Sequence, residues 1–234
     1  MAADTLVFAP TAIALGSLLG PTHGSVSLCY REFARLALLG FGARVRSNGD
    51  SHLPAQARYV FVANHQSHLD SLAILRALER HPVRFVAKQE LGRIPLFGPA
   101  LRATGNVMVS RSDTGRDLAA LEAAQRELLE SVSVLFFAEG TRGTARGLRP
   151  FKRGAAAFAL QAGLPLVPIG VAGSREIYPP GFEVRSGGAI GVAIGEPIET
   201  AGCDLAERAP LTERLQSAVG ALVRRAQALR RRSD

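Results

Sequence analysis

Residues 59–75 read YVFVANHQSHLDSLAIL, where an apolar run stops abruptly at a cluster of polar, ionisable side chains. The apolar run has the length and composition of a strand. Ser67 and Asp70 then have the S-x-x-D spacing of a capping box, which predicts that a helix begins there. A strand that leads into a helix in this way delivers Asn64 and His65 to its carboxyl end, where open α/β sheets place their ligand sites.

The rest of the chain repeats this alternation of strand-like and helix-like runs. Strand-like runs recur as VRFVAK, NVMVS, VLFFAE, PLVPIGVAG and AIGVAIG, beginning at residues 83, 106, 134, 165 and 189. Helix-like runs include SLAILRALER, RDLAALEAAQRELLES and FKRGAAAFALQAG, the last closed by Gly163. This order predicts an α/β domain.

The carboxyl-terminal run TERLQSAVGALVRRAQALRRR places apolar residues at alternating spacings of four and three. These residues are Leu215, Val219, Leu222, Ala226 and Leu229. The spacing predicts one amphipathic helix that docks on the domain. Its arginine-rich end has two interpretations, a solvated basic tail or a contact with phospholipid headgroups.

Length and composition narrow the class of protein. A chain of 234 residues with 47% hydrophobic content suits one domain with a substantial core. The two cysteines are too few for a disulfide framework or a thiolate metal site, which indicates a reducing compartment. The net charge of +8 calls for an anionic partner, and nucleic acid, an anionic membrane surface and phosphorylated small molecules all qualify.

The amino-terminal segment is strongly apolar. The first 24 residues carry one charged side chain, Asp4, and the apolar stretch Leu6–Leu19 is shorter than the ~20 residues that span a bilayer. No basic region precedes it, so we do not expect a signal peptide. A second helical pattern, Val26–Phe41, follows a Gly/Pro turn. Two apolar helices joined in this way predict a hairpin.

This hairpin divides the chain into two parts. We assign residues 1–48 to a membrane-associating helical hairpin and residues 49–234 to a catalytic domain that ends in the basic amphipathic helix. Composition alone leaves two interpretations of the hairpin open. It packs on the domain core, or it sits at the headgroup and acyl boundary of one leaflet.

The polar cluster after the first strand suggests acid–base chemistry. A histidine just before a helix amino terminus feels the positive end of the macrodipole, which favours the neutral ring that accepts a proton. A carboxylate at Asp70, in the first helical turn, can orient the ring of His65. The simpler interpretation is that Asp70 only caps the helix, His68 is exposed and His65 is an ordinary loop residue.

The same cluster has the spacing H-x-x-H-x-D, which raises the possibility of a metal site. Metallohydrolase sites need several ligands at set spacings. The other candidate ligands lie in poorly patterned or isolated positions, His23, His52, His81, Cys29 and Cys203. We therefore expect no metal.

A second polar cluster, GTRGTARGLRPFKRG, follows the strand VLFFAE. Its cations crowd around glycines and are Arg142, Arg146, Arg149, Lys152 and Arg153. Glycines let backbone approach a ligand closely, and arginines grip phosphate in a bidentate way. The G-x-x-x-x-G-K-[ST] pattern of a Walker loop is absent. The cluster predicts an anion site, and the alternative is a solvated basic loop.

Five blocks, in order, resemble the glycerolipid acyltransferase family, whose best-known members acylate 1-acyl-glycerol 3-phosphate. They are NHQSHLD at 64–70, KQELGRIPLFG at 88–98, GNVMVSR at 105–111, FAEGTR at 137–142 and VPI at 167–169. Two positions depart from the family pattern. Ala138 stands where the family commonly has proline, and Ser110 where it commonly has aspartate.

The resemblance implies roles for individual residues. It implies that His65 is the general base and that Asp70 orients it. It implies that three cations hold the acceptor's phosphate, namely Lys88, Arg111 and Arg142. It also implies that the phosphate pocket is shaped by Glu139, Gly140 and Thr141.

The resemblance further implies an α/β fold with a mixed, mostly parallel sheet flanked by helices. The implied reaction transfers a fatty acyl group from acyl-CoA or acyl-carrier protein to the free hydroxyl of lysophosphatidic acid, giving phosphatidic acid. No metal or bound cofactor takes part. Because the acceptor and product are lipids, the resemblance favours a hairpin dipped into one leaflet, at the cytoplasmic face of the cell membrane, in a peripheral or monotopic protein.

Two other functions stay open. One is acyl transfer to a different lyso-lipid, such as lyso-ornithine lipid, whose headgroup is zwitterionic. The other is a non-enzymatic basic protein that binds nucleic acid or a membrane. Nucleic-acid binding favours aromatic stacking groups or a recognisable module, and a chain with 6% aromatic residues and no tryptophan shows neither. We therefore expect no nucleic-acid partner.

Overall fold

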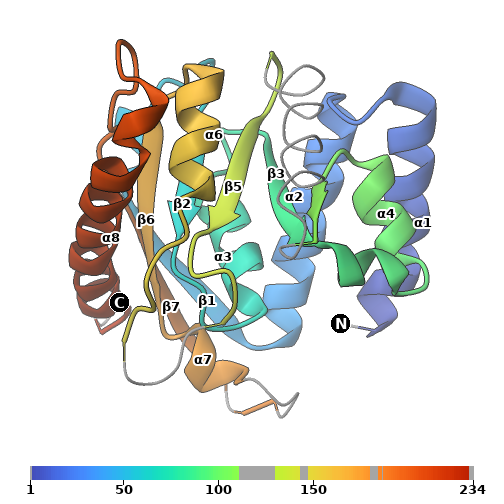
Figure 1. The fold of residues 1–234 in the computed structure, drawn as a ribbon. Helices are drawn as coiled ribbons and strands as arrows, with labels where there is room; N and C mark the ends of the chain where they lie inside the picture. Colours follow the sequence, from blue (N-terminus) through green and yellow to red (C-terminus); the bar gives the residue numbers. More distant parts are fainter. Residues whose placement is uncertain (1, 111–129, 143–146, 180–183, 186, 232–234) are drawn as a thin grey trace.

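The computed structural model describes residues 2–110, 130–142, 147–179, 184–185 and 187–231. Within them, one seven-stranded sheet with the order β1-β7-β6-β2-β5-β3-β4 runs through the molecule (Figure 1). Its strands are β1 (Ala43–Asn48), β2 (Val60–Ala63), β3 (Val83–Lys88), β4 (Val107–Val109), β5 (Ser133–Phe137), β6 (Leu166–Ala172) and β7 (Gly188–Ile194).

The helices are α1 (Ala2–Leu19), α2 (Gly24–Gly40), α3 (Leu69–Ala77), α4 (Phe97–Ala103), α6 (Gly154–Ala162), α7 (Ser174–Ile177) and α8 (Arg208–Arg230). Short 3₁₀ turns are η1 (Asp50–His52), η2 (Gln89–Arg93) and η3 (Leu205–Glu207). The amphipathic run expected at residues 116–131 lies almost entirely outside the described residues.

The sheet is mixed and mostly parallel. Strand β2 pairs in parallel with β5 and β6, β3 pairs in parallel with β5 and β4, and only the β6–β7 pair is antiparallel among the described strands. The register of β2 with its two neighbours places Ala63 beside both Phe137 of β5 and Ile169 of β6, so the carboxyl ends of three adjacent strands meet at one edge. The predicted α/β fold is confirmed.

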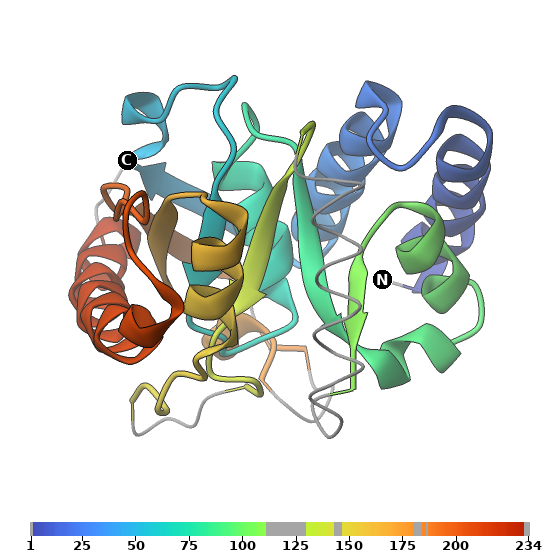
Figure 2. The same cartoon turned by 45° about the horizontal axis from the view of Figure 1, so that its top comes forward.

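Helices cover both faces of the sheet (Figures 1 and 2). Alternate residues of β2 enter two different cores because successive side chains of a strand point to opposite faces. Phe61 packs with α2 and α3, whereas Val62 packs with α6 and α8. The five apolar positions expected on the last helix are buried in α8, and Gly163 ends α6 with φ 63°. Both features agree with the sequence prediction.

The amino-terminal hairpin is present, but the sheet begins earlier than expected. Helix α2 ends at Gly40, and Ala43–Asn48 form edge strand β1, which pairs in parallel with β7. The sheet therefore includes residues before the domain boundary that we expected at residue 49. The run ARVRSN lacks the apolar character of the other strands because edge strands carry polar groups.

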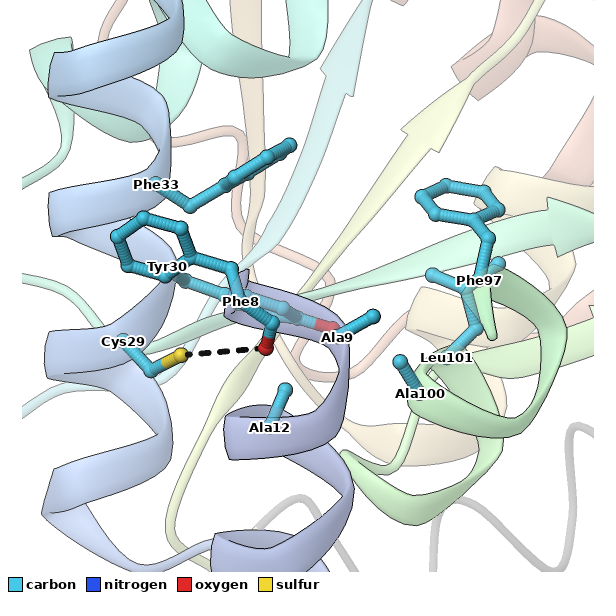
Figure 3. Close-up of a pocket in the computed structure, with 9 residues that line it drawn as sticks. All are labelled: Phe8, Ala9, Ala12, Cys29, Tyr30, Phe33, Phe97, Ala100 and Leu101. Atoms are coloured by element: carbon cyan, nitrogen blue, oxygen red, sulfur yellow. Dashed lines mark hydrogen bonds between the residues drawn. The ribbon is translucent and has the colours of Figure 1, made fainter. Parts of the chain in front are cut away.

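One side of the hairpin packs on the domain. Helix α2 lies against α3, and α1 lies against α4. Between α1, α2 and α4 is an apolar cavity of about 50 Å³ (Figure 3). Its lining residues are Phe8, Ala9, Ala12, Cys29, Tyr30, Phe33, Phe97, Ala100 and Leu101.

The opposite side of the hairpin exposes large apolar side chains. Val7 and Leu18 of α1 are exposed, and so are Leu28 and Leu39 of α2. Each pair is separated by eleven residues, which is about three helical turns, so its members share a face. Along the part of the chain that the structure describes, no helix combines the length and the apolar character needed to cross a membrane.

Candidate active site

Strand β2 delivers two polar residues to the carboxyl edge of the sheet. The first, Asn64, is fully buried. Its Nδ2 donates to the Val171 carbonyl over 3.0 Å, and its Oδ1 accepts from the Val171 amide over 2.8 Å. This pair of hydrogen bonds to β6 fixes the chain as it leaves β2. Asn64 therefore sets the direction from which His65 enters the site.

His65 faces a buried carboxylate. Its Nδ1 lies 2.9 Å from Oδ2 of Asp70, whose side chain is fully buried. The same oxygen accepts from the Gln66 and Ser67 amides over 2.5 and 2.8 Å. The hydroxyl of Ser174 donates to the other oxygen, Oδ1. A carboxylate held by so many donors orients His65 with Nδ1 protonated, which leaves Nε2 as the basic nitrogen.

Asp70 also completes the start of α3. The Ser67 hydroxyl accepts from the Leu69 amide over 3.2 Å and donates to the Tyr178 carbonyl over 2.6 Å. Half of the expected capping box is present, because the Asp70 carboxylate reaches back to the Ser67 amide. Capping and orientation, which we weighed as alternatives, are both carried out by this one carboxylate.

Two residues at the carboxyl end of β5 position the backbone and ring of His65. The His65 amide donates to Oε1 of Glu139 over 2.8 Å, and the Arg149 amide donates to Oε2 over 2.9 Å. Burial raises the pKa of the Glu139 carboxyl, and these two amides partly offset the rise. The imidazole stacks on Phe137 with 4.0 Å between ring centroids and 20° between planes. Glu139 thus connects its own loop after β5 to the loop that contains His65 and to the loop that contains Arg149.

Gly140 makes the turn that follows. Its φ is 71°, a left-handed conformation that glycine adopts without strain. A Cβ added at this position would lie 2.8 Å from Cε of Lys152. Any other residue would both strain the turn and displace Lys152. The turn directs the chain toward Arg142.

Arg142 lies against a second histidine. Its Nη1 is 2.9 Å from Nε2 of His68. Burial lowers the pKa of His68, and the positive charge of Arg142 lowers it further. His68 is therefore neutral near pH 7 and accepts this hydrogen bond at Nε2. The simpler interpretation of the sequence had His68 exposed, and no sequence signal links two residues 74 positions apart.

The Acyltransferase family model matches residues 44–172, more than half of the chain. The chain belongs to the acyltransferase family. The resemblance read from its motif blocks is confirmed.

Curated relatives and a solved structure agree with this assignment. The chain is 36% identical to 1-acyl-sn-glycerol-3-phosphate acyltransferase alpha of Ovis aries over 163 residues, 69% of this chain and 56% of that protein. It is 33% identical to 1-acyl-sn-glycerol-3-phosphate acyltransferase of Salmonella typhimurium over 138 residues, 58% of this chain and 56% of that protein. It spans just over half the length of these relatives.

The crystal structure of the 1-acyl-sn-glycerophosphate (LPA) acyltransferase PlsC of Thermotoga maritima superposes with a TM-score of 0.73. The two chains are 26% identical, and the match covers 89% of this chain and 81% of that one. The two chains share the α/β fold.

Most of the remaining predicted residues lie within the described part of the chain. Lys88 ends β3, which β5 separates from β2, so its backbone lies roughly 10 Å from the end of β2. Its Nζ is 3.1 Å from Oε1 of Glu90. Thr141 is exposed. The basic side chains Arg149, Lys152 and Arg153 are exposed as well. Arg111 and Arg146 lie outside the described residues.

The two histidines of the H-x-x-H-x-D spacing make separate contacts. His65 faces Asp70, whereas His68 faces the guanidinium of Arg142. A positive side chain at Nε2 of His68 opposes a metal cation there. Among the described residues, no three His, Cys, Asp or Glu side chains are grouped as metal ligands.

Proposed function

We propose that the protein transfers a fatty acyl group from an acyl thioester to the free hydroxyl of lysophosphatidic acid. The His65–Asp70 pair carries the proposal, because it places a basic nitrogen at the carboxyl edge of the sheet with a guanidinium nearby. Relatives named as 1-acyl-sn-glycerol-3-phosphate acyltransferases support the same reaction. The product is phosphatidic acid.

In the proposed mechanism, His65 Nε2 removes the proton from the acceptor hydroxyl as the oxygen attacks the thioester carbonyl. The carbon–sulfur bond then breaks, and the imidazolium returns its proton to the departing thiolate. The Asp70 carboxylate stabilises the imidazolium between these two steps. The thioester is already activated, so no acyl-enzyme intermediate, metal or bound cofactor is required. The donor is acyl-CoA or acyl-carrier protein.

Arg142 is our first candidate for the acceptor's phosphate. One of its N–H groups is occupied by neutral His68, and a guanidinium has five N–H donors in all. Within the described ranges no other acceptor is bonded to this guanidinium, so its other donors can make a charge-assisted, bidentate contact with phosphate. Lys88 and Arg111 are proposed to complete the phosphate site, with Glu139, Gly140 and Thr141 shaping it. A lyso-ornithine lipid would present a zwitterion to this site instead.

A panel of acceptors tests this proposal directly. Release of thiol from acyl-CoA and from acyl-carrier protein should be fastest with lysophosphatidic acid and slower with lyso-ornithine lipid, lysophosphatidylcholine and monoacylglycerol. A preference for monoacylglycerol would contradict the phosphate site. No thiol release with any acceptor would contradict acyl transfer. The same assay after dialysis against a chelator should give unchanged activity, because the proposed mechanism requires no metal. A loss of activity that zinc restores would contradict this expectation.

The hairpin is proposed to hold the enzyme at the cytoplasmic face of the cell membrane. Its outer side carries the exposed apolar pairs of α1 and α2, including Leu18 and Leu39, which are 82% and 70% exposed. Arg35 and Glu32 form an ion pair on α2 between Leu28 and Leu39. A charged pair at this place fits the headgroup boundary of one leaflet better than the hydrocarbon core.

Polar substitutions on the outer side of the hairpin should weaken membrane binding. Because β1 already begins at Ala43, point substitutions disturb the sheet less than a deletion. The triple variant Leu18→Gln, Leu28→Gln, Leu39→Gln should sediment with anionic liposomes at least tenfold less, since each buried leucine contributes about 1.5–3 kcal/mol. Its Tm should not fall.

Leu205→Gln provides the matched control, because Leu205 is an exposed leucine on η3, away from the hairpin. It should bind liposomes as the wild type does. If the triple variant binds liposomes as well as the wild type does, the hairpin only packs on the domain and does not bind the membrane.

A further inference from the structure

A second cavity, with several polar and charged residues in its lining, is at the amino-terminal edge of the sheet, opposite His65. The turn between α1 and α2, the end of α3 and the start of β3 enclose about 230 Å³. In Figure 1 this turn is at the end of the molecule opposite α7. Its polar lining includes Thr22, Ser27, Arg31, Arg80, His81 and Arg84. A volume of this size accommodates several water-sized groups, since one water occupies about 30 Å³ of liquid.

Arg84 is the unusual member of this lining, because its side chain is fully buried. Its guanidinium donates to the Pro21 carbonyl over 2.5 Å, the Val83 carbonyl over 3.0 Å and the Ser27 hydroxyl over 3.3 Å. The ring of Tyr30 lies 5.3 Å from its central carbon. Three of the five N–H donors of an arginine are thus accounted for.

The charge of Arg84 is not balanced in the usual way. Its Nε has no hydrogen-bond partner among the described residues. No ion pair joins it to a carboxylate in the ranges that the structure covers. Burial accordingly lowers the pKa of its guanidinium. Buried charges in proteins are normally paired, and an unpaired one is costly.

Further cations surround the same cavity. Arg31 donates from Nη1 to the Glu79 carbonyl over 2.9 Å, but its buried Nε has no partner within the described part of the chain. Arg80 is half exposed at the rim. Three arginines therefore line the cavity.

The two nearby carboxylates already face neighbouring side chains. Glu79 lines the cavity and pairs with Arg76. Asp50 lies 3.2 Å from Nε2 of His81 and 4.0 Å from Arg80. Burial lowers the pKa of His81, which is thus neutral near pH 7. The three arginines exceed the two carboxylates, so the cavity carries an excess of positive charge.

We propose that this cavity binds a compact oxyanion of the phosphate class beside the guanidinium groups of Arg31 and Arg80, with the buried charge of Arg84 behind them. Such an anion would compensate the buried guanidinium and bridge α2 to β3. It would thereby fasten the hairpin to the sheet at the edge away from catalysis. The phosphate group is either a free ion or the headgroup of a membrane lipid, because exposed Leu18 and Leu28 flank the turn. This site does not depend on acyl transfer.

Arginine Nε–H signals in ¹H–¹⁵N spectra test the proposal at the level of single residues. Every protein sample in this test carries Arg142→Ala, so that the phosphate site proposed at Arg142 does not contribute. Inorganic phosphate, compared with chloride at equal ionic strength, should shift the signals of Arg84 and Arg31 in a saturable way. Arg84→Lys and Arg31→Gln assign the two signals by their loss.

The variants then measure the contribution of each donor. Arg31→Gln should raise the dissociation constant for phosphate, measured at Arg84, at least tenfold. Arg214→Gln, which removes an exposed arginine of α8, should leave this constant unchanged. Arg31 is only partly buried, so the test survives if Arg84→Lys fails to fold.

Bicelles separate the two sources of phosphate. A shift of the Arg84 signal with phosphatidylglycerol in phosphatidylcholine, absent with phosphatidylcholine alone, identifies a lipid headgroup. A shift with inorganic phosphate only identifies a free anion. If neither probe moves the Arg84 signal, or if Arg31→Gln leaves the dissociation constant unchanged, the proposal is wrong.

Discussion

Replacement of His65 by alanine should lower the rate of acyl transfer by at least ~10²-fold, which is the lower end of what a positioned general base contributes. The physical reason is the loss of the only ring nitrogen that Asp70 orients toward the sheet edge among the described residues. The measurement is thiol release from acyl-CoA with lysophosphatidic acid. Circular dichroism should be unchanged, because the His65 ring is at the edge of the core and stacks on Phe137 alone among the described aromatic residues.

Two further variants make this result specific. Asp70→Asn should also be severely impaired, because an amide cannot stabilise the imidazolium as a carboxylate does and would leave the Gln66 and Ser67 amides with a weaker acceptor. His52→Ala is the matched control. That histidine bonds to the Gly195 carbonyl away from the site, so activity should be retained. Near-normal turnover in His65→Ala would rule out its role as the base.

Arg142→Ala should lower kcat/KM for lysophosphatidic acid roughly 10- to 150-fold, because a charge-assisted contact contributes about 1.5–3 kcal/mol and each 1.4 kcal/mol is a factor of ten. Arg142→Lys should recover only part of this loss, because an ammonium cannot reproduce the fork of the guanidinium. The KM for the acyl donor should barely change, since the proposed contact is to the acceptor. Steady-state kinetics with each substrate varied in turn gives all three values.

The neighbours of Arg142 sharpen the comparison. His68→Ala removes one acceptor of the guanidinium but leaves its charge, so it should be milder than Arg142→Ala. Arg153→Ala removes an exposed cation at the start of α6 and should have little effect. Equal loss with every acceptor, whether or not it bears a phosphate, would remove Arg142 from the phosphate site while leaving acyl transfer intact.

Local patterns in the sequence were sufficient for most of the elements. The apolar run before Asn64, the S-x-x-D spacing and the closing Gly163 each depend on residues within a few positions of one another. The heptad-like face of α8 is local in the same sense. Such patterns can be read directly because backbone geometry sets their period.

Strand β1 shows where this reading failed. ARVRSN has two arginines and an asparagine in six residues, and nothing local distinguishes it from the polar end of a hairpin. It is a strand because β7 offers it a parallel partner, residue by residue from Ala43 to Asn48. An edge strand buries little, so its sequence carries little of the signal that identifies central strands.

The candidate site divides in the same way. The sequence by itself determined that His65 and Asp70 lie five residues apart around a helix start, which is enough to predict their pairing. Only the tertiary structure brought Ser174 to Asp70, across 104 positions, and Arg142 to His68, across 74. It also buried Arg84, whose Nε has no hydrogen-bond partner among the described residues once the hairpin turn closes over it. These contacts join segments that are far apart in the sequence and meet only when the sheet assembles. No local run of residues therefore predicts them.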